Sequence, residues 1–262
     1  MKKIGDFMRN LLRGFCIAVS MYSKLPVPMV EWEKNSLSFA LCFFPVVGAF
    51  IGAAEIGWWY LAGYLRFGPF LRGAMAAAIP LLVTGGIHMD GFMDTEDARN
   101  SYGDREKKLA ILKDAHLGAF AVIRFGTYFL LYAGLYSELS GIRAVCLTAF
   151  GCMMSRAWSA VGFVTCKPAK NNGLFYEFAS AANKKAVLIS NSLLIAVLTA
   201  AGIRLYPLAG VLLPVISGLT FRYYKRVSYR EFGGITGDLA GYFLQLCELF
   251  LLAAAVLAER VL

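Results

Sequence analysis

The sequence predicts an all-α protein: a polytopic integral membrane helical bundle of about seven transmembrane helices, preceded by an N-terminal interfacial helix. Three observations support this prediction: the composition, the uncharged runs and the placement of the basic residues. The 262-residue chain is 58% hydrophobic, 16% charged and has a mean hydropathy of +0.60. A soluble domain is nearer half apolar and a quarter charged. Repeated uncharged stretches of membrane-spanning length argue against the alternative, a large soluble helical bundle.

The first segment, about residues 3–22, is basic and its apolar pattern is interrupted by Arg9 and Arg13. It lacks a small-residue cleavage site, so it predicts an amphipathic interfacial helix and not a signal peptide. The KLPVP stretch at 24–28 then ends this helix, because proline cannot continue the backbone hydrogen bonding.

Seven apolar segments follow, with three polar segments among them. The expected spans are 36–64, 70–88, 117–137, 142–165, 186–204, 207–221 and 239–258. The polar segments are 89–116, 167–185 and 222–238. We see no internal repeat and no linker, so residues 1–262 are expected to form one membrane-embedded domain.

The basic residues favour one orientation of this layout. Nineteen Lys and Arg residues lie in the N-terminal 35 residues and the three polar segments, against five on the opposite side. The positive-inside rule therefore places the N-terminus and all three polar segments in the cytoplasm. The net charge of +9 is explained by this topology and does not indicate nucleic-acid binding. The six cysteines show no CxxC spacing, so neither a zinc site nor a disulfide framework is supported.

The most unusual stretch is GGIHMDGFMDTEDA, residues 85–98, where acids directly follow an apolar run. If the stretch is helical, Asp90, Asp94 and Asp97 fall on one face, within about 60° of one another. Like charges repel unless a cation lies among them, and carboxylates suit Mg²⁺, Mn²⁺ or Ca²⁺. The stretch therefore resembles half of a metal–phosphate site. A solvated acidic helix with ordinary surface ion pairs is the alternative.

A second candidate is FGGITGDLAG, residues 232–241. Backbone N–H groups at Gly233 and Gly234 could hold phosphate, and Asp238 could add a metal ligand. The alternative role of Asp238 is the N-cap of the last span. Asp114, in KDAHLGAF, has the same two interpretations: a cap of the following span or a ligand.

Charged side chains inside the spans also need an explanation, because they are costly there. Arg124 and Arg156 are candidate phosphate clamps, and interhelix ion pairs are the alternative. Glu55 and Glu248 are expected to face a cavity or to pair with these arginines. His88 is better explained as a hydrogen-bonded structural residue than as a catalyst.

The motifs HMDGFMDTEDA, ILKDAHLGAF and GGITGDLAG, in this order, resemble those of the cobalamin synthase family, the adenosylcobinamide-GDP ribazoletransferases. KLPVP and FFPVVGAFIG resemble that family's opening pattern, and the resemblance runs from about Phe15 to about Glu248. It implies transfer of the phosphocobinamide group of adenosylcobinamide-GDP to α-ribazole or its phosphate, with release of GMP and formation of adenosylcobalamin or its phosphate. It also implies a Mg²⁺ cofactor and a multi-pass location in the bacterial cytoplasmic membrane, with the active site on the cytoplasmic side.

The resemblance also implies roles for the acids. Asp90, Asp94 and Asp97 are the expected metal ligands, and Asp114 and Asp238 are further candidates. Asp94 and Asp97 are the expected catalytic carboxylates. We expect Asp94 to take the proton from the attacking ribose hydroxyl.

Five further residues are expected to contact the pyrophosphate of the substrate, where charge develops during transfer. They are Lys113, Arg124, Arg156, Gly233 and Gly234. The expected partners are the two substrates and the lipid bilayer, without nucleic acid, and a homo-oligomer is left open.

Two other functions are compatible with parts of the sequence. A CDP-alcohol phosphotransferase would need Ala-Arg soon after its first Asp-Gly, whereas Asp90-Gly91 is followed by Phe92, Met93 and Asp94. A cation-coupled transporter would be expected to show inverted repeats and midplane charges. Here no repeat is visible, and the acids gather at one membrane face.

Overall fold

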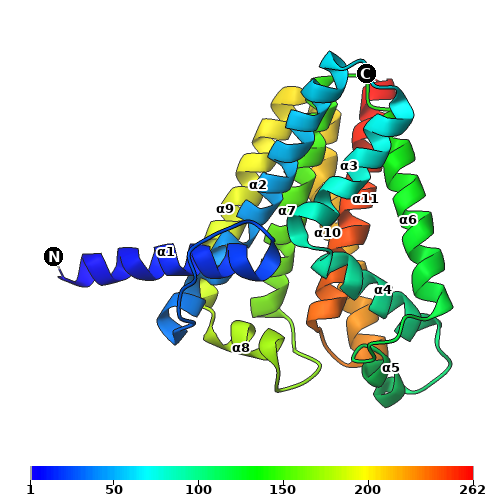
Figure 1. Cartoon of the computed structure of the whole chain (residues 1–262). Coiled ribbons are helices and arrows are strands. Elements are labelled where there is room, and N and C mark those ends of the chain that lie inside the picture. Colours follow the sequence, from blue (N-terminus) through cyan, green and yellow to red (C-terminus); the bar gives the residue numbers. More distant parts are fainter. Residues whose placement is uncertain (1, 262) are drawn as a thin grey trace.

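The computed structural model describes residues 2–261, which are mostly helical and contain no β-strand within that range. The long helices run side by side, and α1 projects from them at a steep angle (Figure 1). In chain order the elements are α1 Lys2–Tyr22, α2 Lys34–Tyr64, α3 Pro69–Thr84, α4 Ile87–Asn100, α5 Arg105–Ile111, α6 Ala119–Ser137, α7 Ile142–Thr165, α8 Leu174–Ala181, α9 Lys184–Leu205, α10 Pro207–Val227, the π-helical turn η1 Ser228–Phe232 and α11 Gly237–Val261.

The predicted membrane bundle is confirmed, and its count of about seven spans stays a prediction. Within the described residues, five helices are long and apolar enough to cross a membrane: α2, α6, α7, α9 and α11. The bent pair α3 and α4 gives a sixth if it is counted as one span. α10 packs between α9 and α11 but is not among these helices. Arg222, Lys225 and Arg226 end its apolar part well before the usual length of about 20 residues.

The predicted span 70–88 ends early, at Thr84. Gly85 and Gly86 have φ angles of 66° and 82°, in the left-handed region that glycine adopts without strain. The chain therefore turns by 100° between α3 and α4. α4 carries four acids and one arginine, so we assign it to the membrane interface and not to a membrane-spanning helix.

The predicted interfacial helix corresponds to α1. Its C-terminal part packs against α2, where Ile17 and Ala18 are fully buried. Along its free part, Phe7, Met8 and Leu12 are each at least half exposed. A helix that leaves the bundle sideways with exposed apolar side chains suits the boundary between lipid and water. α1 thus marks the level of that boundary on the bundle.

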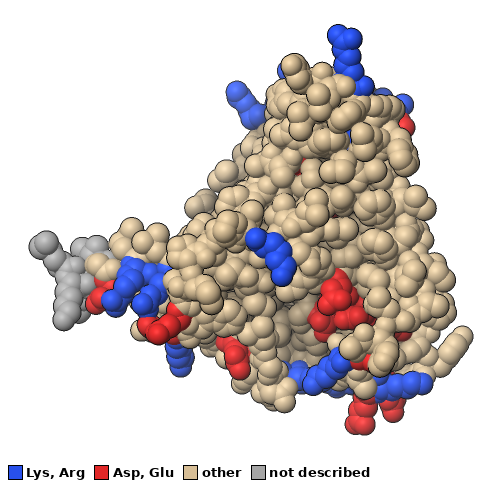
Figure 2. Space-filling view, viewed as in Figure 1, with Lys and Arg blue, Asp and Glu red and all other residues tan. Residues whose placement is uncertain are grey.

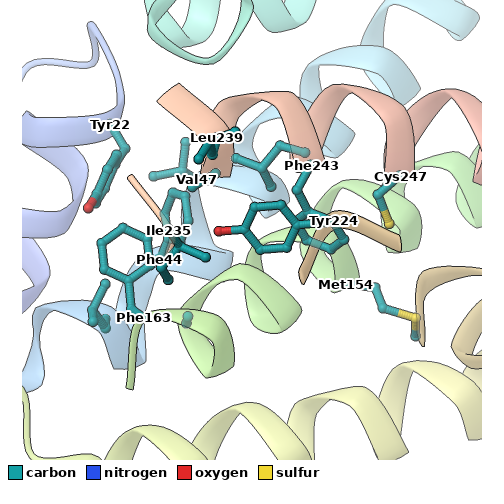
Figure 3. Close-up of a cluster of buried hydrophobic side chains, with 14 of the residues drawn as sticks. Tyr22, Phe44, Val47, Met154, Phe163, Tyr224, Ile235, Leu239, Phe243 and Cys247 are labelled. Carbon is teal, nitrogen blue, oxygen red and sulfur yellow. The ribbon is translucent and has the colours of Figure 1, made fainter. Parts of the chain in front are cut away.

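The core forms where α2, α7 and α11 meet. Gly48 and Gly52 lie four residues apart on α2, and a side chain at either would collide with Cys152 or Ala149 of α7. Such small residues let two membrane helices approach closely. Aromatic and aliphatic side chains from α1, α2, α7, α10 and α11 fill the adjoining interior (Figure 3).

Candidate functional site

The two acidic motifs meet because α4 packs against the beginning of α11. A Cβ atom on Gly91 would lie 2.7 Å from the Cα of Asp238, and one on Gly241 would lie 2.6 Å from the carbonyl oxygen of His88. Only glycine permits these contacts, because a side chain would have to displace backbone atoms. The two backbones therefore touch, and Asp90 and Asp238 line the same cavity.

Four carboxylates interact at this junction. Burial, followed by the charges of Asp90, Asp238 and Asp97, raises the pKa of Asp94 to about 7. Among the described residues, no cation or hydrogen-bond donor offsets this repulsion at Asp94. Figure 2 shows the result as a patch of acidic side chains over α4. Such a cluster favours either a bound cation or a retained proton.

The acids do not form a closed metal cage. In the range 2–261, no three His, Cys, Asp or Glu side chains lie close enough together to hold an ion by themselves. This donor set still fits Mg²⁺, which usually takes one or two carboxylates and completes its shell with water and substrate phosphate. It does not fit zinc, which prefers nitrogen and sulfur ligands.

Three hollows surround the Asp90–Asp238 pair. The first, which we call the aromatic cavity, has a volume of about 290 Å³ and is lined by both aspartates and several aromatic rings. The second, the open depression, has a volume of about 820 Å³ and lies between α1, α3 and α4, with Asp90 in its wall. The third, the basic pocket, has a volume of about 160 Å³ and contains Asp238, Lys113 and Lys170. Each aspartate therefore belongs to two hollows.

The basic pocket brings two cations next to one carboxylate. Burial, and then the charge of Lys113, lowers the pKa of Lys170, whereas Asp238 acts in the opposite direction. Lys113 was expected at the site, but Lys170 was not. A short parallel backbone pairing between Pro168 and Ile235 holds the loop that carries Lys170 in this position. Because the two residues are far apart in the sequence, no local sequence pattern predicts this pairing.

Comparison with known proteins identifies the family. A family model described as cobalamin-5-phosphate synthase matches residues 14–256. The chain belongs to this family. It is 45% identical over 251 residues to the adenosylcobinamide-GDP ribazoletransferase of Lachnoclostridium phytofermentans, with 96% of each chain covered. It is 31% identical to the enzyme of that name from Clostridium botulinum strain Alaska E43, covering 95% of this chain and 99% of the relative. No solved structure matches the chain.

Within this synthase chain, Asp97 has a structural contact of its own. One oxygen accepts a hydrogen bond from the N–H of Gly118 at 2.6 Å, and the other accepts one from Ala121 at 2.9 Å. Asp97 therefore caps the N-terminus of α6, where backbone N–H groups lack partners. Its role as a metal ligand stays a prediction, and the cap sets it apart from Asp90 and Asp94.

Asp114 lies outside the acidic junction. It is exposed, it lines none of the three hollows, and its Oδ1 accepts hydrogen bonds from the backbone N–H and the ring of His116. These bonds lower the pKa of Asp114. The expectation that Asp114 caps the next span was wrong, because Asp97 supplies that cap. The structure gives no support to its assignment as a ligand.

Asp238 is not the N-cap of α11. Thr236 fills that position, and its hydroxyl accepts the N–H of Leu239 at 3.2 Å. The Asp238 carboxylate is thus left to face the cavities from the first turn of the helix, where negative charge is favoured. A threonine three residues before Leu239 was the sequence signal for this cap.

Gly233 and Gly234 have backbone roles here. Both of their N–H groups donate to the carbonyl oxygen of Ser228, so neither is free to bind phosphate. A Cβ on Gly233 would collide with the guanidinium of Arg105, and one on Gly234 would lie 2.6 Å from the carbonyl oxygen of Lys167. The structure therefore does not support the expectation that these two glycines contact the pyrophosphate. Their lack of a side chain instead permits neighbouring segments to pack closely.

Arg156 and Arg124 are engaged in ion pairs, the alternative considered for them above. Arg156 is 1% exposed and lies 2.6 Å from Glu248 in the core. Arg124 lies 3.3 Å from Glu96 and is half exposed. Neither arginine lines any of the three hollows, so the structure does not support the expected pyrophosphate contacts.

Proposed function

We propose that this chain transfers the phosphocobinamide group of adenosylcobinamide-GDP to α-ribazole or its phosphate, releasing GMP. One observation carries the proposal: the aspartates of two separate family motifs converge with two lysines where three hollows meet. Transfer of a phosphoryl group needs little covalent chemistry from the protein, and it depends on positioning and on charge stabilisation. This junction offers both.

Asp90 and Asp238 are the residues best placed to hold Mg²⁺, with Asp94 beside them. When bound, the ion would neutralise charge on the diphosphate. Lys113 and Lys170 would bind the phosphate oxygens from the basic pocket. A ribose hydroxyl of the acceptor then forms the new P–O bond to the corrinoid-bearing phosphorus, and the bond to GMP breaks.

Asp94 is the residue we assign to accept the hydroxyl proton. A base works best when its pKa lies near the operating pH, and the pKa of Asp94 is raised to about 7. Burial, and then the surrounding carboxylates, raise this pKa and make Asp94 a better proton acceptor than an isolated carboxylate.

The proposed location is the bacterial cytoplasmic membrane, with this site on the cytoplasmic side. The helix ends that carry most of the basic residues lie at one end of the bundle, together with α5 and α8 (Figure 1). The acidic junction lies toward that end, near the level of α1. The positive-inside rule assigns such an end to the cytoplasm.

The proposal is tested with membranes that carry the protein, supplied with adenosylcobinamide-GDP, α-ribazole and Mg²⁺. We expect GMP release coupled to cobamide formation, and a loss of about a hundredfold or more in Asp94→Asn. Glu106→Gln, an exposed acid of the same segment, is the matched control and should keep its activity. Full activity in Asp94→Asn would contradict the assigned role, and no product with the wild type would contradict the function.

A further inference from the structure

The aromatic cavity combines an apolar wall with an acidic edge. Side chains of Phe44, Phe163 and Phe175 are part of its wall, while Asp90 and Asp238 form its polar edge. Its volume of about 290 Å³ lies at the lower end of the range for ligand sites, about 300–1,000 Å³. A flat group of two fused rings suits this volume, whereas a corrin macrocycle is too large for it.

The rings come from four separate segments and enclose the space from different directions. Tyr22 and Phe44 have centroids 4.2 Å apart, and Phe163 and Phe175 have centroids 4.3 Å apart. Phe178 meets Tyr22 edge to face at 6.2 Å. Figure 3 shows Tyr22, Phe44 and Phe163 together at one end of the buried cluster. Aromatic rings arranged in this way favour the binding of a planar aromatic group.

His88 adds an unsatisfied polar atom to this wall. Its ring lies 6.0 Å from that of Tyr22 in a stacked arrangement and 5.7 Å from that of Phe44. The side chain is 5% exposed, and within the described residues its Nε2 has no hydrogen-bond partner. A buried polar atom without a partner costs free energy, and a ligand nitrogen next to the imidazole would offset that cost.

We propose that the aromatic cavity binds the heteroaromatic base of the acceptor nucleoside, with the His88 N–H donating to a ring nitrogen and the ribose facing Asp90 and Asp238. This inference rests on the proposed function and names the subsite of one substrate. It places the reacting hydroxyl at the carboxylates, because the sugar is attached to the base at the open, acidic edge of the cavity.

The other hollows suit the other substrate. The open depression is larger, at about 820 Å³, and reaches Asp90 from the opposite side, which suits the bulky corrinoid. The basic pocket, with Lys113 and Lys170, suits the diphosphate. The guanine base is a poorer guest for the aromatic cavity, because its amide edge needs several hydrogen-bond partners and the wall is mostly apolar.

The first test removes one wall of the cavity. In Phe163→Ala, whose ring lines the aromatic cavity and neither of the other hollows, we expect the KM for the nucleoside to rise about tenfold, as for the loss of a base-stacking contact, while the KM for adenosylcobinamide-GDP stays within about twofold. Phe129→Ala removes a half-buried ring on α6 outside the cavity and should change neither constant. Thermal unfolding of each variant confirms that the fold is retained.

The second test addresses His88 through the ligand. Nucleosides bearing benzimidazole or indole differ by a single ring nitrogen. The wild type should prefer the benzimidazole nucleoside by about fivefold or more, the value of one hydrogen bond. His88→Phe keeps a ring in place and should lose this preference. Direct binding of each nucleoside to the purified protein, measured by fluorescence, gives the same comparison without turnover.

Two outcomes would overturn the inference while leaving the proposed function intact. One is an unchanged nucleoside KM in both Phe163→Ala and His88→Phe. The other is a raised KM for adenosylcobinamide-GDP alone, which would assign the cavity to guanine. A wild type that binds the nucleoside without releasing GMP would instead contradict the proposed function and support the subsite.

Discussion

Charged side chains gather in two regions of this molecule. In the first region they are paired with partners, and in the second region like charges lie close together. Inside the bundle, Glu55 accepts hydrogen bonds from Tyr132 at 2.8 Å and Thr148 at 3.1 Å. Arg156 and Glu248 pair at 2.6 Å. These side chains are removed from water, and each has a partner that offsets part of the loss of hydration. This region holds the helices together.

At the junction of α4 and α11 the charges are only partly compensated: Lys170 offsets the charge of Asp238, whereas the neighbouring charges that act on Asp94 are all negative. Asp90, Asp94 and Asp238 repel one another beside open hollows, and such an arrangement lowers stability unless a ligand completes it. Paired opposite charges inside the membrane therefore indicate a structural role. Like charges clustered beside a cavity indicate a site that binds or converts a ligand. Changes in the first region should affect stability, and changes in the second should affect activity.

Metal removal should have the largest effect and should act on the acidic junction alone. A chelator is expected to abolish GMP release, because the carboxylates and the diphosphate would then face each other without a metal ion between them. Added Mg²⁺ should restore activity, and Asp90→Asn should need a higher Mg²⁺ concentration for half-maximal rate. Unaltered turnover after exhaustive chelation would contradict this prediction.

Removal of a junction carboxylate should lower activity without lowering stability. In Asp238→Asn we expect kcat/KM to fall about a thousandfold, while the midpoint of thermal unfolding stays equal or rises because like-charge repulsion is relieved. Turnover assays and thermal scans on the same preparation check both parts. A large loss of stability would show that Asp238 serves the fold instead.

The buried ion pair should respond in the opposite manner. Arg156→Met leaves Glu248 without its cation and with only the hydroxyl of Ser155 as a partner, and it should lower the free energy of unfolding by about 3–5 kcal/mol. The matched control is Arg124→Met, whose ion pair is half exposed and should contribute less than about 1 kcal/mol. Equal effects of the two substitutions, measured by denaturant unfolding in detergent, would refute the distinction between the two regions.

Asp97 lies between the two regions and should give the smallest effect. Asp97→Ala removes the cap of α6 and is expected to lower the free energy of unfolding by about 1–2 kcal/mol. Asp97→Ser can still accept a backbone N–H and should recover much of that loss. If both substitutions instead abolish turnover of folded protein, Asp97 is a member of the reaction site.

Much of the fold could be predicted from the sequence, because long apolar runs report directly on membrane helices. The span expected at 142–165 is α7 without change, and that expected at 186–204 lies within α9. The bend at Gly85–Gly86 could not be predicted, since paired glycines permit both a helix and a left-handed turn. The packing of α4 on α11 decides between them.

The candidate site was predicted in part. The shared face of the α4 acids could be derived from helical spacing. The placement of Asp90 and Asp238 on the same side of the membrane followed from the basic residues, and their joint role as ligands came from the resemblance. The sequence alone could not predict that Asp97 caps α6 or that Lys170 lies beside Asp238. Both features depend on contacts between segments that are distant in the sequence. The ion-pair partners of Arg156 and Arg124 could not be predicted either, because the sequence contains several acidic residues that could pair with each arginine.

Asp90 stands in the wall of both the aromatic cavity and the open depression. Two reactants in these hollows would approach the same carboxylate from separate sides, so neither has to leave before the other arrives. We therefore expect a ternary complex, and initial-rate plots against both substrates should intersect as in a sequential mechanism. Because each reactant has its own route, excess of one should not compete with the other.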